Sequence, residues 1–228
     1  MREGDVIHKT CRRYNTPGDA HELTFSCYRH QPLLLEDRTR LWLAESISIA
    51  RERHKFDLWA WVFMPTHVHL LILPTIKEYS ISDILQAIKY RVAWKELNLA
   101  RMNDPDRLAS MSTGQKHRPF RFWQDGGGFD KNLNLTEAIR NSVIYIHNNP
   151  LREGLAQTAE EWPWSSAREW SGFTDTPLHI DKNHFPLTWQ GALLIFSVQM
   201  TRGTLSLVLE AGGATKSRSA CACLAQTE

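Results

Sequence analysis

Hydrophobic and polar residues alternate in the first region where the chain predicts regular structure. In residues 21–28, Leu23, Phe25 and Cys27 alternate with polar neighbours, which is the pattern of a strand with one buried face. In residues 36–53 the apolar positions recur at near-helical spacing among evenly matched charges, as on an amphipathic surface helix. We therefore expect a strand followed by a helix.

Two apolar runs come next, and a loop of hairpin length separates them. Residues 56–63 and 67–73 are both rich in aromatic or branched apolar side chains, and residues 64–66 lie between them. Runs of this kind joined by a short loop predict two neighbouring antiparallel strands.

A second helix and a long loop are predicted after this hairpin. Apolar residues at helical spacing indicate a helix over residues 81–97, with Ser80 or Ser82 as its N-cap. Residues 98–116 are polar and irregular, and the sequence Asp-Pro-Asp at 104–106 is typical of a turn. We expect a loop there.

A short strand and a third helix complete the pattern. The strand fits residues 120–124, and the glycine run at 126–128 would stop it. The helix is expected over residues 135–149, with Asn134 as its N-cap and Pro150 at its end.

The order strand, helix, strand, strand, helix, strand is that of a ferredoxin-like domain, here with one added helix. We expect an α+β fold with an antiparallel sheet, helices on one face and an additional helix that bears a tyrosine. The chain has 228 residues, of which 42% are hydrophobic, enough to form a packed core. The expected divisions are an N-terminal extension (1–20), one domain (21–186) and a poorly ordered C-terminal tail (187–228).

Charge and cysteine content narrow the possible function. The net charge is only +2, but between Gln86 and Lys131 nine Lys and Arg face five acids, a local charge of +4. Such a region is equally compatible with a solvated surface and with a phosphate-binding patch. The four cysteines have neither disulfide-framework nor metal-ligand spacing, and no apolar run approaches the ~20 residues that span a bilayer. These features favour a cytoplasmic protein that is not embedded in a membrane.

A histidine pair opens the strand expected over residues 67–73. Successive side chains of a strand alternate between faces, so His67 and His69 share one face and Val68 lies on the other. Two neutral imidazoles in this arrangement can bind one metal ion. Histidines at a strand end are more often packed or hydrogen-bonded, yet the rest of this strand is wholly apolar, and two polar residues at its start need a reason.

The third expected helix carries a tyrosine away from its apolar stripe. Asn141, Tyr145 and Asn149 are four residues apart and therefore lie on one helical face. A half-buried aromatic residue is the simpler interpretation, because a phenol with its ordinary pKa of about 10 needs a nearby cation, base or metal to act as a nucleophile. The expected core-facing stripe consists of Leu135, Ile139, Val143 and Ile146.

Four further stretches of the sequence form recognisable motifs, namely Met64-Pro-Thr-His-Val-His-Leu-Leu, Phe122-Trp-Gln, Tyr145-Ile-His-Asn-Asn-Pro-Leu-Arg-Glu-Gly-Leu and Trp162-Pro-Trp-Ser-Ser. In this order they resemble the motifs of the HUH-type single-tyrosine transposases and, within them, of the bacterial REP-associated tyrosine transposases. The resemblance covers roughly residues 21–185 and departs from the family pattern at residues 125–128, where Asp-Gly-Gly-Gly replaces aromatic and basic residues.

The resemblance implies a transposase, monomeric or homodimeric, that cuts and rejoins single-stranded DNA beside a hairpin through a 5′-phosphotyrosine link. Carried over by position, Tyr145 is the nucleophile, His67 and His69 bind Mg²⁺ or Mn²⁺, and Asn149 matches a position that often completes the metal site. DNA would be bound by phosphate contacts and base stacking. The candidates for these contacts are Lys89, Arg91, Lys95, Arg118, Arg121 and Trp123.

Two other functions are compatible with the sequence. A descendant of a transposase could recognise repeat hairpins without cleaving them, and the glycine run and atypical tail would permit this. A metal-dependent nucleotide hydrolase is disfavoured because Leu71 stands where an H-x-H-x-H pattern would have its third histidine.

Overall fold

The computed structural model describes residues 13–186, 200–201 and 204–205. The chain divides into two compact units, Met1–Leu187 and Thr188–Glu228. In the second unit, the described residues form a small antiparallel pair, β5 (Met200–Thr201) and β6 (Thr204–Leu205). The remainder of the expected tail, and residues 1–12 of the expected N-terminal extension, lie outside the described residues.

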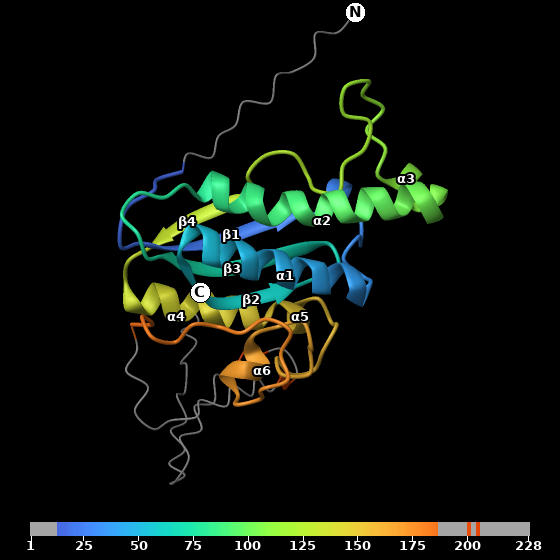
Figure 1. Ribbon diagram of the computed structural model, residues 1–228. Helices are drawn as coiled ribbons and strands as arrows, with labels where there is room; N and C mark the ends of the chain where they lie inside the picture. Colours follow the sequence, from blue (N-terminus) through green and yellow to red (C-terminus); the bar gives the residue numbers. More distant parts are fainter. Residues whose placement is uncertain (1–12, 187–199, 202–203, 206–228) are drawn as a thin grey trace, which may run out of the picture. The chain divides into compact units, whose positions relative to one another are not determined.

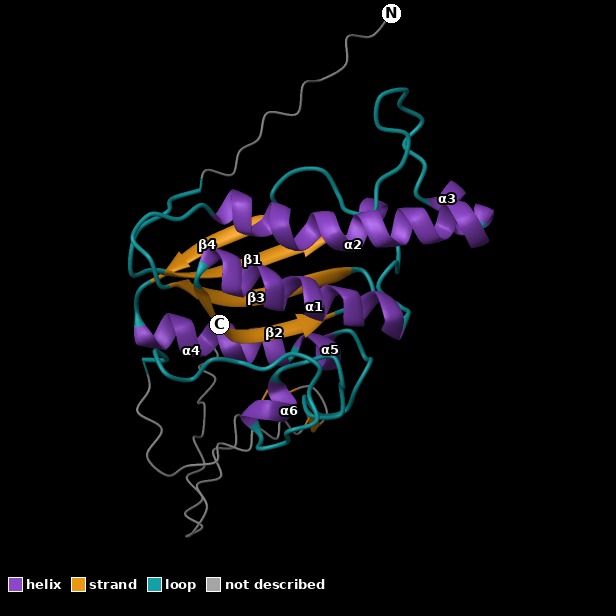
Figure 2. Cartoon of the chain, viewed as in Figure 1, coloured by secondary structure: helices purple, strands orange, loops and turns teal. Residues whose placement is uncertain are grey.

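A four-stranded antiparallel sheet forms the centre of the first unit (Figure 1). Its strand order, β2-β3-β1-β4, is that of a ferredoxin-like domain, so the predicted α+β fold is confirmed. Along the chain, helix α1 lies between β1 and β2, and helix α2 follows β3 and precedes β4 (Figure 2). The elements are β1 (Ala20–Ser26), α1 (Asp37–His54), β2 (Phe56–Phe63), β3 (His67–Pro74), α2 (Ile81–Asn103) and β4 (Phe129–Leu133).

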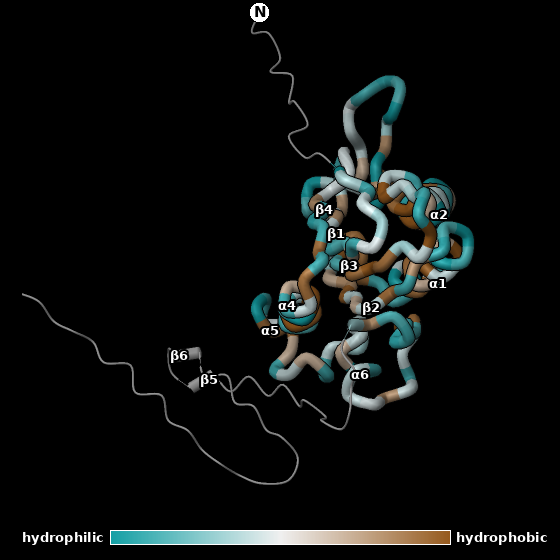
Figure 3. The backbone as a smooth tube through the Cα atoms, turned by 90° about the vertical axis from the view of Figure 1, so that its left-hand side faces the viewer, coloured by the Kyte–Doolittle hydropathy of each residue, from teal (hydrophilic) through white to brown (hydrophobic). Residues whose placement is uncertain are grey.

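Helices cover both faces of this sheet. Because strand side chains alternate, Val68, Leu70 and Ile72 of β3 enter the core beneath α1 and α2, and Leu71 enters a second core on the other face. Helix α4 (Thr136–His147) packs over that second core through Ile139, Val143 and Ile146. Figure 3 shows α1 and α2 on one side of the strands and α4 on the other.

The loop expected over residues 98–116 is partly helical, and that prediction was wrong. Helix α2 continues to Asn103, and α3 (Pro105–Ser110) follows it directly. The Asp104 side chain accepts a hydrogen bond from the backbone N–H of Arg107, and Pro105 stands at the start of the helix. The Asp-Pro-Asp sequence is therefore a helix start, where an N-cap and a following proline both stabilise the first turn. Of the two predicted caps for α2, Ser80 is the one that accepts the Asp83 N–H.

The strand expected over residues 120–124 was also misplaced. This segment forms only an isolated bridge between Cys27 and Trp123 and another between Ser112 and Phe120. The fourth strand is β4, which begins immediately after the glycines and pairs with β1. It is short and carries an exposed Phe129 and polar residues, so it lacks the apolar pattern by which the other strands were predicted.

Gly128 makes the approach of β4 to β1 possible. Its φ is +72°, and a Cβ built there would lie 2.0 Å from the carbonyl oxygen of Thr24. Only glycine adopts this conformation readily and leaves room for that carbonyl. The glycine run thus has a specific structural role at this position.

The tyrosine-bearing helix is shorter than expected. Helix α4 begins at Thr136 and ends at His147, and α5 (Asn149–Arg152) follows with Pro150 in its first turn. Leu135 is the N-cap residue and is 68% exposed, so it is not part of the core stripe, and Asn134 does not cap the helix. Two short helices complete the described first unit, the 3₁₀ helix η1 (Tyr28–His30) and α6 (Ala167–Trp170).

Candidate metal and tyrosine site and a basic groove

The histidine pair lies at the start of β3, on the sheet face that α4 covers. The His67 and His69 ring centroids are 4.9 Å apart, and the rings meet edge to face. Val68 between them enters the core on the other face. The alternation expected from the sequence therefore places both imidazoles in one environment.

His69 is held as a neutral imidazole with one unused nitrogen. It is 4% exposed, and its Nδ1 lies 2.8 Å from Thr24 Oγ1 on the neighbouring strand β1. Its Nε2 is buried and, in the described part of the chain, has no hydrogen-bond partner. Burial lowers the pKa of His69 to about 3, and the nearby His67 and Arg152 act in the same direction. A neutral imidazole that is oriented through one nitrogen and keeps its other nitrogen free is typical of a metal-binding histidine.

His67 is more accessible and has polar groups at both ring nitrogens. Its Nδ1 lies 2.9 Å from Thr66 Oγ1, and its Nε2 lies 3.8 Å from Oε1 of Glu153. Burial lowers the pKa of His67, Glu153 opposes that shift, and His30 adds to it. Both histidines are thus uncharged near neutral pH.

Tyr145 projects from α4 beside this pair. Its ring centroid is 5.5 Å from that of His69, and the rings meet edge to face. The side chain remains accessible because Tyr145 is 39% exposed. The guanidinium of Arg152 lies over the Tyr145 ring, 5.1 Å from its centroid. The structure therefore brings a phenol, two neutral imidazoles and a cation together.

Asn149 lies one turn after Tyr145 and is only 6% exposed. Its Nδ2 donates hydrogen bonds to the backbone carbonyls of Tyr145, at 2.7 Å, and of Ile146, at 3.5 Å. The side chain therefore satisfies carbonyls at the C-terminal end of α4, a common role for a polar residue at this position. Its amide oxygen is the atom that remains for a metal.

The imidazole nitrogens of His67 and His69 and the amide oxygen of Asn149 are atoms of the kind that bind divalent ions, although they do not form a complete coordination shell. Among residues 13–186 and the four described residues beyond, no group of three or more His, Cys, Asp or Glu side chains forms a ready metal site. The fit depends on the orphaned Nε2 of His69 and on the uncharged state of both rings. Neutral imidazole is a common ligand for divalent metals.

Three residues at this site were not identified from the sequence, namely Thr24, Arg152 and Glu153. Thr24 is brought to His69 by the β1–β3 register, in which the two residues are paired. Arg152 and Glu153 come after the end of α4, and only the packing of α4 on the sheet brings them to β3. No local pattern signals such contacts.

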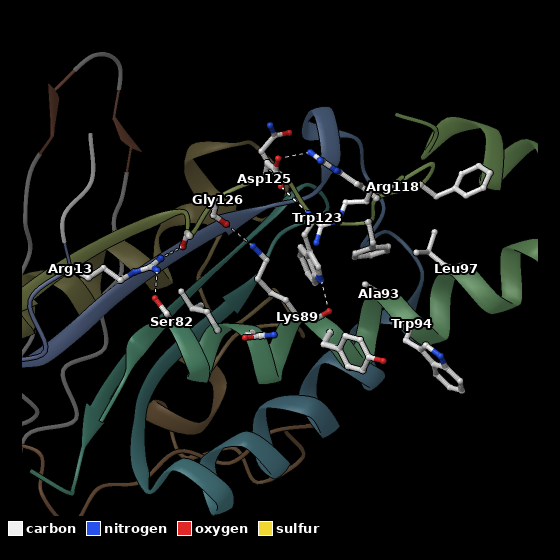
Figure 4. Close-up of a pocket in the computed structure, with 18 of the residues that line it drawn as sticks. Arg13, Ser82, Lys89, Ala93, Trp94, Leu97, Arg118, Trp123, Asp125 and Gly126 are labelled. Atoms are coloured by element: carbon white, nitrogen blue, oxygen red, sulfur yellow. Dashed lines mark hydrogen bonds and ion pairs between the residues drawn. The ribbon is translucent and has the colours of Figure 1, made fainter. Parts of the chain in front are cut away.

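A groove of about 680 Å³ lies over α2, on the sheet face opposite the histidine pair. Its other wall is the segment 118–127 (Figure 4). Of the six proposed DNA contacts, Lys89, Arg118, Arg121 and Trp123 line it. Arg91 and Lys95 do not, and Lys95 pairs instead with Glu45 on α1 at 2.5 Å. The groove also contains the strongly exposed aromatic residues Tyr90 and Trp94, which the sequence alone did not distinguish from helix surface.

The charges of the groove are partly neutralised within it. Asp125 pairs with Arg121 at 2.6 Å and with Arg118 at 3.4 Å. Burial lowers the pKa of Lys89 to about 8, and the nearby Arg13 contributes to the shift. Lys89 Nζ donates to the Gly126 carbonyl, as Figure 4 shows. The groove thus combines cations with exposed rings, which is the chemistry of single-strand binding.

Comparison with known proteins supports the resemblance that the motifs indicated. Residues 18–101 match the sequence model of the family described as "Transposase IS200 like". A putative REP-associated tyrosine transposase of Haemophilus influenzae is 29% identical over 147 residues, which is 59% of this chain and 76% of the relative. The REP-associated tyrosine transposase of Escherichia coli is 23% identical over 189 residues, covering 82% and 93%. The resemblance to the tyrosine transposases is confirmed.

The fold of the transposase-like chain agrees with a solved relative. The structure of a REP-associated tyrosine transposase bound to a REP hairpin superposes with a TM-score of 0.54 at 22% identity, and covers 71% of this chain and 84% of that one. At this identity the likeness concerns the fold. Among the helices that the structure describes, none has both the length and the apolar character to cross a membrane.

Proposed function

We propose that this transposase relative cuts and rejoins single-stranded DNA beside a hairpin, with Tyr145 as the nucleophile. The observation that carries the proposal is the position of the Tyr145 ring, 5.5 Å from a histidine whose buried Nε2 has no partner in the described chain. The names of the relatives support the transposase class, and the solved relative is bound to a REP hairpin. A divalent metal ion and a covalent phosphotyrosine intermediate are part of the same proposal.

In the proposed reaction, the Tyr145 oxygen attacks the phosphorus of a phosphodiester. An oxygen–phosphorus bond to the phenol forms, the bond from phosphorus to the 3′ oxygen breaks, and the strand is left with a free 3′-hydroxyl. The partly exposed phenol can release its proton to solvent, and the departing 3′ oxygen takes up a proton from solvent. Attack by a second 3′-hydroxyl reverses the step and joins a different strand, so no external energy source is needed.

The surrounding residues have distinct roles in this proposal. His67 and His69, with the amide oxygen of Asn149, would hold Mg²⁺ or Mn²⁺, which stabilises negative charge on the non-bridging phosphate oxygens when it is bound. Thr24 orients the His69 ring through Nδ1. Arg152, beside Tyr145, can donate to the same phosphate, because guanidinium matches phosphate geometry.

The groove over α2 is the proposed contact surface for single-stranded DNA. Arg118 and Arg121 would contact phosphates, while Tyr90 and Trp94 offer exposed rings on which bases can stack. The groove and the histidine pair lie on opposite faces of the sheet, so DNA binding does not require the histidines. Hairpin binding without cleavage is therefore the alternative function. It agrees with the absence, among the described residues, of a ready-made group of three metal ligands.

The test is covalent trapping. Labelled hairpin DNA with single-stranded flanks is incubated with the full chain and Mn²⁺, and a protein–DNA adduct is sought on a denaturing gel. The wild type and Tyr14→Phe, whose exposed tyrosine is outside the site, should form the adduct, while Tyr145→Phe and a sample with EDTA should not. Hairpin binding by the wild type without any adduct would reject the enzyme proposal in favour of the alternative.

A further inference from the structure

Glu153 is an acidic residue at the histidine pair with no role in the function proposed above. It follows α5 directly, and its side chain is 44% exposed. Its Oε1 lies 3.8 Å from Nε2 of His67. Within the described part of the chain, the carboxylate contacts His67 and accepts no hydrogen bond that would hold it elsewhere. The carboxylate can therefore move relative to the imidazole.

The ligands assigned so far leave the metal centre without a negative charge. Histidine ligands bind a metal ion as neutral imidazoles, and the Asn149 amide is uncharged. The cation of Arg152 lies at the same site, 5.1 Å from the Tyr145 ring centroid. Without a carboxylate, a doubly charged ion would thus enter a place where the nearest charge is positive, and it would meet two nitrogen ligands and one amide oxygen. Mg²⁺ prefers oxygen ligands and is usually held by one or two carboxylates.

Glu153 is an acidic side chain close enough to His67 to share an ion with it. Adjacent ligands of an octahedral ion with bonds of about 2.1 Å are about 3 Å apart. The observed 3.8 Å between Oε1 and Nε2 differs from that by less than the movement that an exposed glutamate side chain can make. A histidine binds a metal ion as the neutral imidazole, so a shared cation, rather than an ion pair, would hold the two groups together.

We propose that Glu153 binds the divalent ion together with His67 and His69, and that its carboxylate gives the centre its affinity for Mg²⁺. This inference rests on the proposed function, because it assumes that the histidine pair holds a metal. It adds an anionic ligand from the segment after α5, supplied by a residue that the motif comparison left without a role.

The test measures metal binding without DNA. Mn²⁺ binding to the full chain is followed by electron paramagnetic resonance, and Mg²⁺ is then added as a competitor. Glu153→Gln keeps the size of the side chain and removes its charge. We expect a loss of Mn²⁺ affinity on the order of tenfold or more and a larger loss for Mg²⁺, which depends more on anionic oxygen. Glu153→Asp, which keeps the charge on a shorter side chain, should recover part of the affinity.

Matched variants separate failure of this inference from failure of the proposed function. Glu52→Gln removes an exposed charge from α1 and should bind both metals as the wild type does. His67→Ala tests the metal centre itself. If His67→Ala loses Mn²⁺ while Glu153→Gln keeps wild-type affinity and metal preference, Glu153 is not a ligand and the inference fails alone. If His67→Ala binds Mn²⁺ normally, the metal centre fails and the inference fails with it. Circular dichroism confirms that each variant is folded.

Discussion

The two faces of the sheet carry surfaces of opposite character. Under α4, His69 is 4% exposed, and its environment is set by strand register and by the packing of one helix. Over α2, Trp94 is 58% exposed, and the groove is built from a helix surface and a loop. The first arrangement favours chemistry, which needs fixed geometry and neutral ligands, and the second favours contact with a long polymer. Substitutions should therefore separate cleavage from binding.

The largest effect is expected on the α4 face. His69→Ala removes the ligand with the orphaned nitrogen, so adduct formation with Mn²⁺ should fall on the order of 100-fold or more. Hairpin affinity measured in EDTA should be unchanged, because the groove lies on the other face. His179→Ala, which removes a surface histidine paired with Glu169, is the control. Equal loss of binding and cleavage would show that the two surfaces are not separate.

A smaller effect, on DNA binding and not on cleavage, is expected from a substitution in the groove. Trp94→Ala removes an exposed ring, and loss of base stacking should weaken single-strand binding by about 1–3 kcal/mol. Adduct formation at saturating DNA should stay at the wild-type level. Fluorescence anisotropy gives the affinity, and Phe173→Ala, an exposed ring outside the groove, provides the comparison. Unchanged affinity in Trp94→Ala would place the DNA elsewhere.

Neutralising the acid of the groove should strengthen binding. Asp125→Asn releases Arg118 and Arg121 from their ion pairs, and each arginine that gains a phosphate should steepen the salt dependence of log K by about 0.7. We expect tighter binding by a few-fold, since exposed ion pairs are weak. Asp175→Asn, which frees Arg168 outside the groove, should change neither the affinity nor the salt slope. Weaker binding by Asp125→Asn would mean that the acid itself contacts DNA.

The smallest effect is a pH dependence of the groove. The pKa of Lys89 is lowered to about 8, so the side chain is charged below that pH and neutral above it. DNA affinity should therefore decrease modestly as the pH rises from about 7 to about 9. Lys89→Arg keeps its charge over this range and should remove the decrease. Lys95→Arg, outside the groove, should retain it, and the same decrease in both variants would assign it to another group.

Most of the central sheet could be predicted because β2 and β3 are apolar on both sides and β1 alternates between apolar and polar residues. Both strands of the hairpin, β2 and β3, lie between helices, so their composition indicates them clearly. The fourth strand could not be recognised, because an edge strand with an exposed Phe129 has no core-facing pattern over most of its length. The helix start at Asp104 was missed because Asp-Pro serves equally well in a turn and at a helix N-terminus.

The candidate site was predictable where it depends on local periodicity. Alternation placed His67 beside His69, and helical spacing placed Tyr145 away from the core stripe. Glu153 was beyond such reasoning, since its contact with His67 depends on how α4 and α5 pack against the sheet. The exposed rings of the groove were missed for a related reason: a helix surface becomes a wall only when a distant loop lies opposite it.

Gly128 has a consequence for engineering this chain. Its backbone lies against Thr24, whose side chain holds His69, so one residue of β1 contacts both the base of the loop and a proposed metal ligand. Loops transplanted from relatives to change DNA preference must therefore keep glycine at this position. A side chain at this position would push on Thr24 and disturb His69, the proposed metal ligand on the other face of the sheet. A loop exchange that keeps Gly128 is therefore expected to change DNA preference without disturbing the proposed metal site.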